Sequence, residues 1–227
     1  QANLPTLKRN ALNNLPVVQF NTNQSLSLNK NIKATEYTFM FLTRQIGGTN
    51  RRFVIGDDNK LFGYWNGGKD QLHIDGWLSP SPGSPQSNTE WDLYVIRRES
   101  NGRTFMHRNG DTGKMIANGG NSPIFNGFYL NTGGCCGGET SDAQFAEVAF
   151  WKRSLNADEI KKAEGYMSWK WGLQAELPDN HTYSAKPTEW NTGVVIPIVV
   201  KEKLNLKNIF QKHAILKFRS LLINTEM

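Results

Sequence analysis

Hydrophobic and polar positions alternate over residues 142–151 and then recur at helical spacing as far as Trp171. Such alternation is typical of a strand whose two faces lie in different environments. One face is expected to carry Ala146, Val148 and Phe150, and the other Phe145, Glu147, Ala149 and Trp151. A single strand and a single amphipathic helix, coming after a long run of strands, predict a helix that covers a finished sheet.

The helix has its own start and stop signals. Asn156 is placed to cap the first turn, and Glu159 stands at the third helical position, which is a variant of the capping box. Gly172 is placed to end the helix in a left-handed conformation. The residues expected on the buried stripe, at steps of three and four, are Ile160, Ala163, Met167 and Trp171.

The chain before this segment reads as short strands separated by turns. The strand candidates are residues 15–21, 37–42, 53–55, 61–65, 71–75, 91–96, 104–108, 114–117 and 125–130. Within 71–75, Leu72 and Ile74 are expected to point inward and Gln71, His73 and Asp75 outward. Turns recur at about ten-residue spacing, as in antiparallel sandwiches. Residues 79–88, with Pro80, Pro82 and Pro85, predict a long irregular loop of a kind that often has a function.

Several motifs resemble one known family. They are the Leu-Pro-Val-Val-Gln-Phe strand at 15–20, the Ala-Glu-Val strand at 146–148, the Ser-Leu-Asn-Ala-Asp-Glu-Ile helix start, the Gly-Tyr-Met-Ser-Trp-Lys-Trp-Gly-Leu helix end, and the run Leu177-Pro178…His181…Tyr183…Pro187. Together they resemble the concanavalin A-like jelly-roll domains of the laminin G-like group, found in secreted bacterial proteins and in phage and virus particles. The resemblance covers about residues 1–190. It implies an all-β, antiparallel two-sheet jelly roll with one helix packed on it, which binds carbohydrate or another surface partner; the helix and its Trp-rich end are structural in that group.

Residues 191–227 differ in kind from the rest. They hold six Lys or Arg against two Glu, so they carry +4 of the net charge of +6. Residues 194–200 predict an extended segment in which Pro197 restricts pairing to an edge, and Phe210, Ala214, Phe218 and Leu221 or Leu222 indicate an amphipathic helix. We interpret this extension as a docking arm for a protein partner; a membrane-surface helix and a passive extension remain alternatives. The nearly neutral sandwich argues against nucleic-acid binding by the main domain.

The apolar runs and the cysteines restrict the possible membrane topology and disulfide bonding of the chain. No apolar run approaches the roughly 18–20 residues that span a bilayer. The two cysteines, Cys135 and Cys136, are adjacent, which excludes a conventional disulfide between distant residues. Two free thiols, a vicinal disulfide and a metal-binding pair all remain open.

The sequence lacks a complete pattern of catalytic residues. Glycoside hydrolases of this shape use paired carboxylates, and the closest pattern is Glu90 and Asp92, with Val95 near the position where a third acid is expected. Glu147 is the single acid on its strand. Nucleophile-elbow, phosphate-loop and zinc-helix motifs are absent from the sequence. We therefore predict no catalytic residues.

Carbohydrate binding needs exposed aromatic faces beside polar side chains. The candidate ligand-binding residues are Tyr64, Trp65, His73, Asp75 and Trp77. Trp77 is the best candidate for exposure, because it follows Gly76 and precedes the Pro-rich loop. Each has a structural alternative: Trp65 as a core residue, for example, and His73 as a solvated side chain. Core or helix packing is expected for Trp91, Trp151, Trp169 and Trp171.

Calcium is the cofactor that the sequence suggests. The candidate ligands are Asp57, Asp58, Glu139 and Asp142. Relatives in the resembled family often carry an acid just before the Ala-Glu-Val strand, which is the position of Asp142. They also often carry acids after the first strand, where this chain has Asn21 and Asn23, and Ca²⁺ prefers carboxylates. Solvated turn carboxylates are the alternative for all four.

The function predicted from the sequence is non-catalytic surface recognition of a glycan, in a secreted protein or on the surface of a phage or virus particle. The second prediction is a structural decoration or assembly module of a particle, anchored by residues 191–227. The third is a glycoside hydrolase. A glycan array distinguishes the first two, and polysaccharide turnover that Glu90→Gln abolishes would establish the third.

Overall fold

The computed structural model describes residues 4–29, 34–49, 51, 54–56, 61–74, 76–78, 89–113, 117–119, 128–131, 139–187, 197–198 and 220–221. The predictions for Asp57, Asp58, Asp75, Cys135, Cys136 and the loop at 79–88 fall outside these residues. The division into a domain at 1–190 and an extension at 191–227 stays a prediction.

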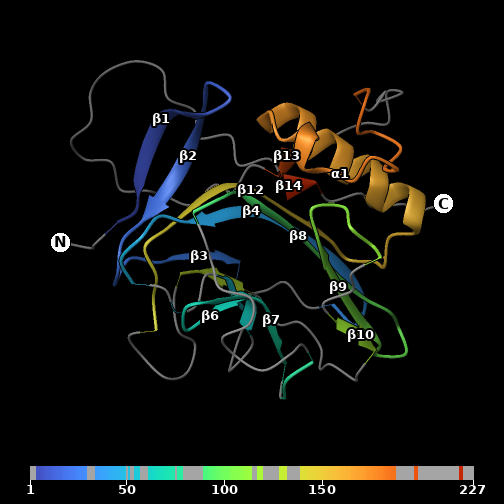
Figure 1. Cartoon of the computed structure of the whole chain (residues 1–227). Helices are drawn as coiled ribbons and strands as arrows, with labels where there is room; N and C mark the ends of the chain where they lie inside the picture. Colours follow the sequence, from blue (N-terminus) through green and yellow to red (C-terminus); the bar gives the residue numbers. More distant parts are fainter. Residues whose placement is uncertain are drawn as a thin grey trace.

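The described residues form two antiparallel sheets that face each other (Figure 1). The seven-stranded sheet has the order β1-β2-β12-β4-β8-β9-β10, and the five-stranded sheet has the order β3-β11-β5-β6-β7. The strands are β1 (Thr6–Leu12), β2 (Leu15–Phe20), β3 (Leu26–Asn29), β4 (Tyr37–Gln45), β5 (Val54–Gly56), β6 (Leu61–Trp65), β7 (Gly68–His73), β8 (Asp92–Arg98), β9 (Thr104–Arg108), β10 (Ala117–Gly119), β11 (Phe128–Leu130) and β12 (Ala143–Trp151). Helix α1 (Ala157–Trp171) and the short 3-10 helix η1 (Gln174–Glu176) follow β12. The fold is a jelly-roll β-sandwich with one helix packed on the outer face of the larger sheet, as the sequence predicts.

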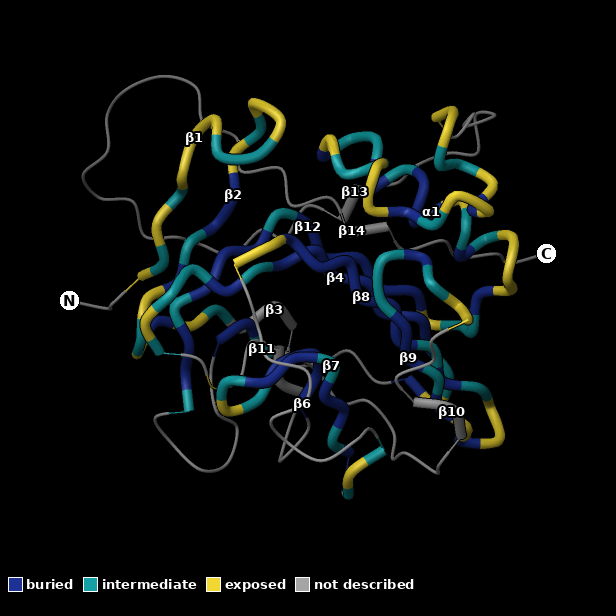
Figure 2. The backbone as a smooth tube through the Cα atoms, in the orientation of Figure 1, coloured by how far each residue is buried: buried dark blue, intermediate teal, exposed yellow. Residues whose placement is uncertain are grey.

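The core has two layers, one on each face of the seven-stranded sheet. The layer between the sheets is rich in rings; Phe39 of β4 and Phe62 of β6, for example, pack edge to face with their centroids 5.9 Å apart. The second layer lies between the sheet and α1 and includes Met40 of β4 and Trp171 of the helix. Because β4 is covered on both faces, nearly all its residues are buried, and the central strands form the dark region of Figure 2.

At Gly63 of β6 the backbone comes close to aromatic rings of the opposite sheet. Its φ is +92°, and a Cβ there would lie 3.3 Å from ring atoms of both Phe41 and Tyr94. Only glycine meets both the backbone and the packing requirement at this position.

The helix begins and ends as predicted. The side chain of Asn156 accepts hydrogen bonds from the backbone N–H groups of Asp158 and Glu159, and the Glu159 carboxylate accepts one from the N–H of Asn156. Gly172 is left-handed, with φ +72°. The predicted stripe is buried, and its members Ile160, Ala163, Met167 and Trp171 all belong to the outer layer of the core.

We expect Asn156→Ala to lower the free energy of unfolding by about 1 kcal/mol, because two backbone N–H groups lose their acceptor. Asn156→Asp keeps the acceptor oxygen and is the matched control. Urea denaturation followed by tryptophan fluorescence measures both variants. Equal stability of Asn156→Ala and the wild type would show that water replaces the cap without cost.

The prediction for the faces of β12 is wrong at its start. The register with β4 pairs Phe145 with Thr43 and Glu147 with Leu42, so Ala146 is an extra residue in a β-bulge. Phe145 therefore shares the core between the sheets with Val148 and Phe150, although its spacing from them indicates the opposite face. Ala146 packs against the layer under α1 instead.

Strand β7 contains a second bulge. Gly63 pairs with Gln71 and Tyr64 with Lys69, so Asp70 is the extra residue, and its φ is +62°. Leu72 and Ile74 are buried as predicted, but Gln71 is fully buried, and the expectation that it points outward to solvent is wrong. Its Nε2 donates a hydrogen bond to the carbonyl of Lys69 at 3.1 Å.

Two short strands are described in the C-terminal extension, β13 (Pro197–Ile198) and β14 (Ser220–Leu221), and they pair with each other. Pro197 thus lies in a two-stranded pair. The predicted amphipathic helix is wrong at Leu221, because this residue pairs with Pro197 in a ladder and has extended backbone. Residues 210–219 lie outside the described part of the chain.

Candidate functional site

Trp77 presents the most exposed aromatic side chain of the described residues, with 42% of its surface accessible. The backbone around it is fixed by two hydrogen bonds, from the Ile74 N–H to the Gly76 carbonyl and from the Leu78 N–H to the Leu72 carbonyl, both 2.9 Å. Trp77 also forms an isolated β-bridge with His73. The His73 ring packs against the indole at a centroid distance of 5.1 Å and an angle of 74°. The result is a surface indole on a rigid turn.

The other predicted aromatic residues do not join Trp77. Trp65 pairs with Gly68 at the turn of the β6–β7 hairpin, whereas His73 pairs with Leu61 at the opposite end. Four residue steps along β6, from Leu61 to Trp65, separate the two ends by about 13 Å. Trp65 is partly buried. The structure therefore brings His73 and Trp77 together and places Trp65 apart.

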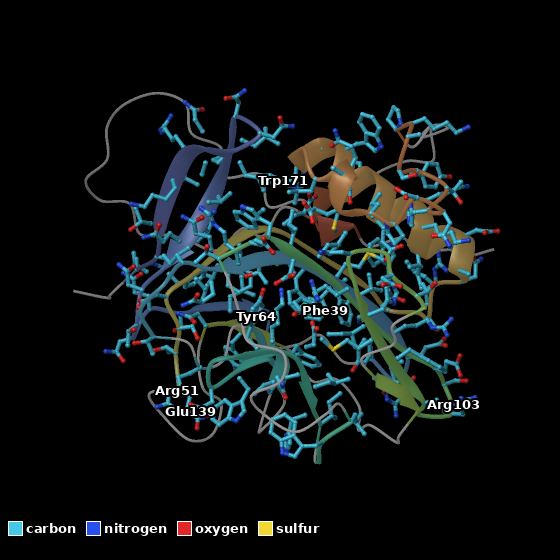
Figure 3. The ribbon with its side chains drawn as sticks, in the orientation of Figure 1. Phe39, Arg51, Tyr64, Arg103, Glu139 and Trp171 are labelled. Carbon is cyan, nitrogen blue, oxygen red and sulfur yellow. The ribbon has the colours of Figure 1, made fainter. Side chains whose placement is uncertain are left out.

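Tyr64 lies in the interior between the two sheets (Figure 3), with no accessible surface. Its hydroxyl donates to the carboxylate of Asp92, which is itself 1% exposed. A ligand at the surface cannot reach this ring, which corrects the expectation of an exposed face at Tyr64. This hydrogen bond satisfies the hydroxyl inside the protein.

Asp92 belongs to a buried charged cluster that the sequence did not reveal. Arg108 Nη1 donates to Asp92 Oδ1 at 2.9 Å, and Arg108 Nε donates to Asp70 Oδ1 at 2.8 Å. Lys69 Nζ lies 3.5 Å from Asp92 Oδ1, and the Tyr94 hydroxyl donates to Asp70 at 2.9 Å. Two cations and two carboxylates thus link the edge strand β7 to β8 and β9 of the other sheet.

The electrostatics of this cluster agree with its burial. Burial raises the pKa of Tyr94 well above its usual value, and the nearby Asp92 and Asp70 raise it further. Burial opposes the charge on Arg108, but Asp92 and Asp70 outweigh it and raise the pKa of that guanidinium. The tyrosines therefore stay neutral and Arg108 stays charged, and the cluster acts as a cross-link between the sheets.

The carboxylates considered for hydrolysis lie in different surroundings. Asp92 is buried in the charged cluster, whereas Glu90 is exposed. Glu147 is buried under α1, where Oε2 accepts hydrogen bonds from Trp171 Nε1 at 2.6 Å and from Lys170 Nζ at 2.8 Å. This contact anchors the last turn of the helix to β12.

Asp142, the leading calcium candidate, binds backbone groups from two loops. Oδ1 accepts from the Thr22 N–H and Oδ2 from the Thr49 N–H, both at 2.8 Å. Glu139 lies three residues before it, in the segment whose Ser141 hydroxyl accepts the N–H of Arg51. The described residues contain no group of three or more His, Cys, Asp or Glu placed to hold a metal ion. Calcium at Asp142 and Glu139 stays a prediction, as it does for Asp57 and Asp58.

One more buried cluster connects the helix to the larger sheet. Glu164 of α1, fully buried, accepts from His107 Nε2 of β9 at 2.6 Å and from His181 Nε2 at 3.2 Å. Burial raises the pKa of Glu164, but the hydrogen bonds from the two histidines outweigh this effect and leave that pKa below its usual value. The signal in the sequence was the spacing, because Glu164 lies between Ala163 and Met167 on the buried stripe.

None of the helices in the described part of the chain is long and apolar enough to cross a bilayer. No family model matches the sequence, and no curated protein matches it. The class of this protein is therefore defined by its architecture, an antiparallel jelly-roll sandwich with one covering helix, and its place in the laminin G-like group stays a resemblance.

Solved structures give distant likenesses. A heptameric SAP-like pentraxin from Limulus polyphemus is 11% identical over 62% of this chain and 74% of its own, with a TM-score of 0.40. The binding domain of botulinum neurotoxin serotype G is 12% identical over 72% of this chain and 47% of its own, with a TM-score of 0.47. Domain 4 of an extracellular arabinanase from Geobacillus stearothermophilus, solved with arabinotriose, is 12% identical over 69% of this chain and 74% of its own, with a TM-score of 0.41. These likenesses are too distant to carry an argument about function.

Proposed function

We propose that this protein is a non-catalytic recognition module that binds carbohydrate at Trp77. The observation that supports the proposal is the exposed indole held by the backbone hydrogen bonds of residues 72–78. The C–H face of a sugar ring stacks on such a surface, and a ring that is already fixed loses little freedom on binding. His73 lies at the edge of the indole, where its imidazole can hydrogen-bond a sugar hydroxyl.

The remaining predicted contacts extend this site in different ways. Asp75 lies between His73 and Trp77 in the sequence and is proposed as a second polar contact. Trp65, at the far end of the hairpin, would contact only a glycan of several sugar units, because the two ends lie about 13 Å apart. Tyr64 is buried in the sandwich and makes no ligand contact in this proposal.

We place this activity outside the cell or on the surface of a phage or virus particle, where a glycan-binding sandwich meets its ligand. No catalytic step is part of the proposal. Residues 191–227 are proposed to contact a protein partner, and calcium is proposed as a bound ion at Asp142 and Glu139. A glycan array read with and without added Ca²⁺ tests the ligand and the ion together.

We expect Trp77→Ala to weaken glycan binding at least about tenfold, which corresponds to roughly 1.4 kcal/mol. The melting temperature should change less than it does when a core aromatic residue is truncated, because 42% of the Trp77 surface is exposed. Leu4→Ala is the matched control, since Leu4 is the other large apolar side chain exposed in the described residues, at 55%.

Two results would contradict the proposal. Glycan binding that Trp77→Ala leaves intact would remove Trp77 from the site. An array on which the wild-type protein binds nothing at high concentration would favour the structural decoration module.

A further inference from the structure

A row of four side chains crosses the outer face of the seven-stranded sheet. In strand order these are Gln19 of β2, Gln144 of β12, Arg44 of β4 and Trp91, which directly precedes β8. Gln144 pairs with Gln19 on one side and with Arg44 on the other, and the pairing of Thr43 with Asp92 places Arg44 opposite Trp91. Three strand spacings make the row about 14 Å long.

Contacts along the row hold Arg44 in one position. Arg44 Nε donates to Gln144 Oε1 at 2.8 Å, and Gln144 Nε2 donates to Gln19 Oε1 at 2.9 Å. On its other side the guanidinium carbon lies 4.9 Å from the centre of the Trp91 ring. Stacking on an indole and a hydrogen bond at Nε together fix the plane of the guanidinium and leave its Nη edge facing away from Gln144.

The charge of Arg44 has no carboxylate partner among the described residues. Arg108 and Arg153 each contact at least one carboxylate, and Arg44 contacts none. Asp142, two residues before Gln144, binds the N–H groups of Thr22 and Thr49 instead. Burial lowers the pKa of Arg44, and no neighbouring anion opposes this effect. A partly buried cation that is fixed in place but not neutralised can gain most from an anion that binds from outside.

We propose that Arg44, with Gln144 and Gln19, forms a binding site for an acidic sugar, with the sugar carboxylate on the Nη edge of Arg44. The planar guanidinium matches a carboxylate with two parallel hydrogen bonds. The neighbouring amides supply donors and acceptors for sugar hydroxyls at strand spacing. This site lies on the seven-stranded sheet, whereas Trp77 follows the edge strand of the five-stranded sheet, so it does not depend on the function proposed for Trp77.

Calorimetry on the full 227-residue chain tests the site with two acidic probes, a galacturonate trimer and sialyllactose. The neutral counterparts are the carboxyl-reduced trimer and lactose. We expect an acidic probe to bind at least about tenfold more tightly than its counterpart, as the loss of a charge-assisted hydrogen bond predicts. Arg44→Gln should remove this preference, while Trp77→Ala should keep it.

Arg103→Gln is the matched control, because Arg103 also lies over an aromatic ring, 5.2 Å from the centre of Phe105, but has no amide row beside it. Arg103→Gln should change the affinity for the acidic probes by no more than about twofold, which is less than half the free energy of a tenfold change. If Arg44→Gln does not fold, NMR of the wild-type protein tests the site instead. The Arg44 Nε–H resonance, assigned by its loss in Arg44→Lys, should shift when an acidic probe is added and stay in place when a neutral one is added.

Three results would overturn the site: equal binding of acidic and neutral probes, an equal loss in Arg103→Gln, or no binding of either acid at millimolar concentration. The failure of Trp77→Ala to affect neutral glycans would overturn the function proposed above but leave this site intact. The two proposals therefore fail separately.

Discussion

Replacing Glu164 with alanine is expected to lower the free energy of unfolding by about 3 kcal/mol, because the change leaves two buried histidine N–H groups without their acceptor. His107 and His181 each donate Nε2–H to this carboxylate. The Tyr183 N–H donates to Nδ1 of His181 at 3.2 Å, which selects the neutral form of His181 that carries its proton on Nε2. Urea denaturation at neutral pH measures the loss.

The control for this change is Glu176→Ala, at an exposed glutamate of η1, which should alter stability by no more than about 0.5 kcal/mol.

The pH dependence of stability gives a second test of Glu164. The pKa of Glu164 is lower in the folded protein than its ordinary value of 4.5, so its stabilisation is present above that value and is lost as the pH falls through the folded pKa. The stability difference between wild type and Glu164→Gln should therefore hold from pH 7 down to about 4.5 and shrink below that pH. A difference that stays constant below this pH would contradict the role of the ionised carboxylate.

Asp92→Ala is expected to cost about 4 kcal/mol, since it leaves Arg108 and Lys69 near the core with one carboxylate fewer. Asp92 is 1% exposed and also accepts a hydrogen bond from the Tyr64 hydroxyl. Thermal unfolding and urea denaturation measure this loss. Asp179→Ala, at an exposed aspartate, is the control and should be close to neutral.

A double variant separates the charge effect from packing. Asp92→Leu combined with Arg108→Met removes one charge of each sign and replaces both side chains with apolar ones of similar volume. The double variant should therefore recover part of the stability that Asp92→Ala loses. A double variant less stable than Asp92→Ala would mean that the hydrogen bonds themselves, and not the stranded charge, determine the cost.

Much of the fold could be predicted because its signals are local. The helix over 157–171 carries its cap, its stop and its stripe within the same segment, and Asn156, Glu159 and Gly172 act as their positions indicate. The alternation of Leu72 and Ile74 and the apolar run of β4 identify strands for the same reason. The candidate site was predictable only in part. Trp77 is exposed as expected, whereas Tyr64 is buried, because whether an aromatic ring is covered depends on the opposite sheet.

The bulges show where local patterns stop being sufficient. One extra residue, Ala146 in β12 or Asp70 in β7, reverses the faces of a strand without changing its composition. Which residue bulges depends on the register against the neighbouring strand. The strand register was therefore needed to place Phe145 in the core and to identify Arg108 as the ion-pair partner of Asp70.

By itself, the sequence determined that this chain forms an antiparallel sandwich with one capped helix, since periodicity and capping depend on residues within a few positions of one another. The tertiary structure decided the partners of the charged side chains. Glu164 meets His107 across 57 positions, Asp92 meets Tyr64 across 28, and Arg44 meets Gln144 across 100. Coulomb and hydrogen-bond energies depend on distances in space. Only the packing of strands and helix brings these groups within 3 Å, or leaves Arg44 without a carboxylate partner among the described residues.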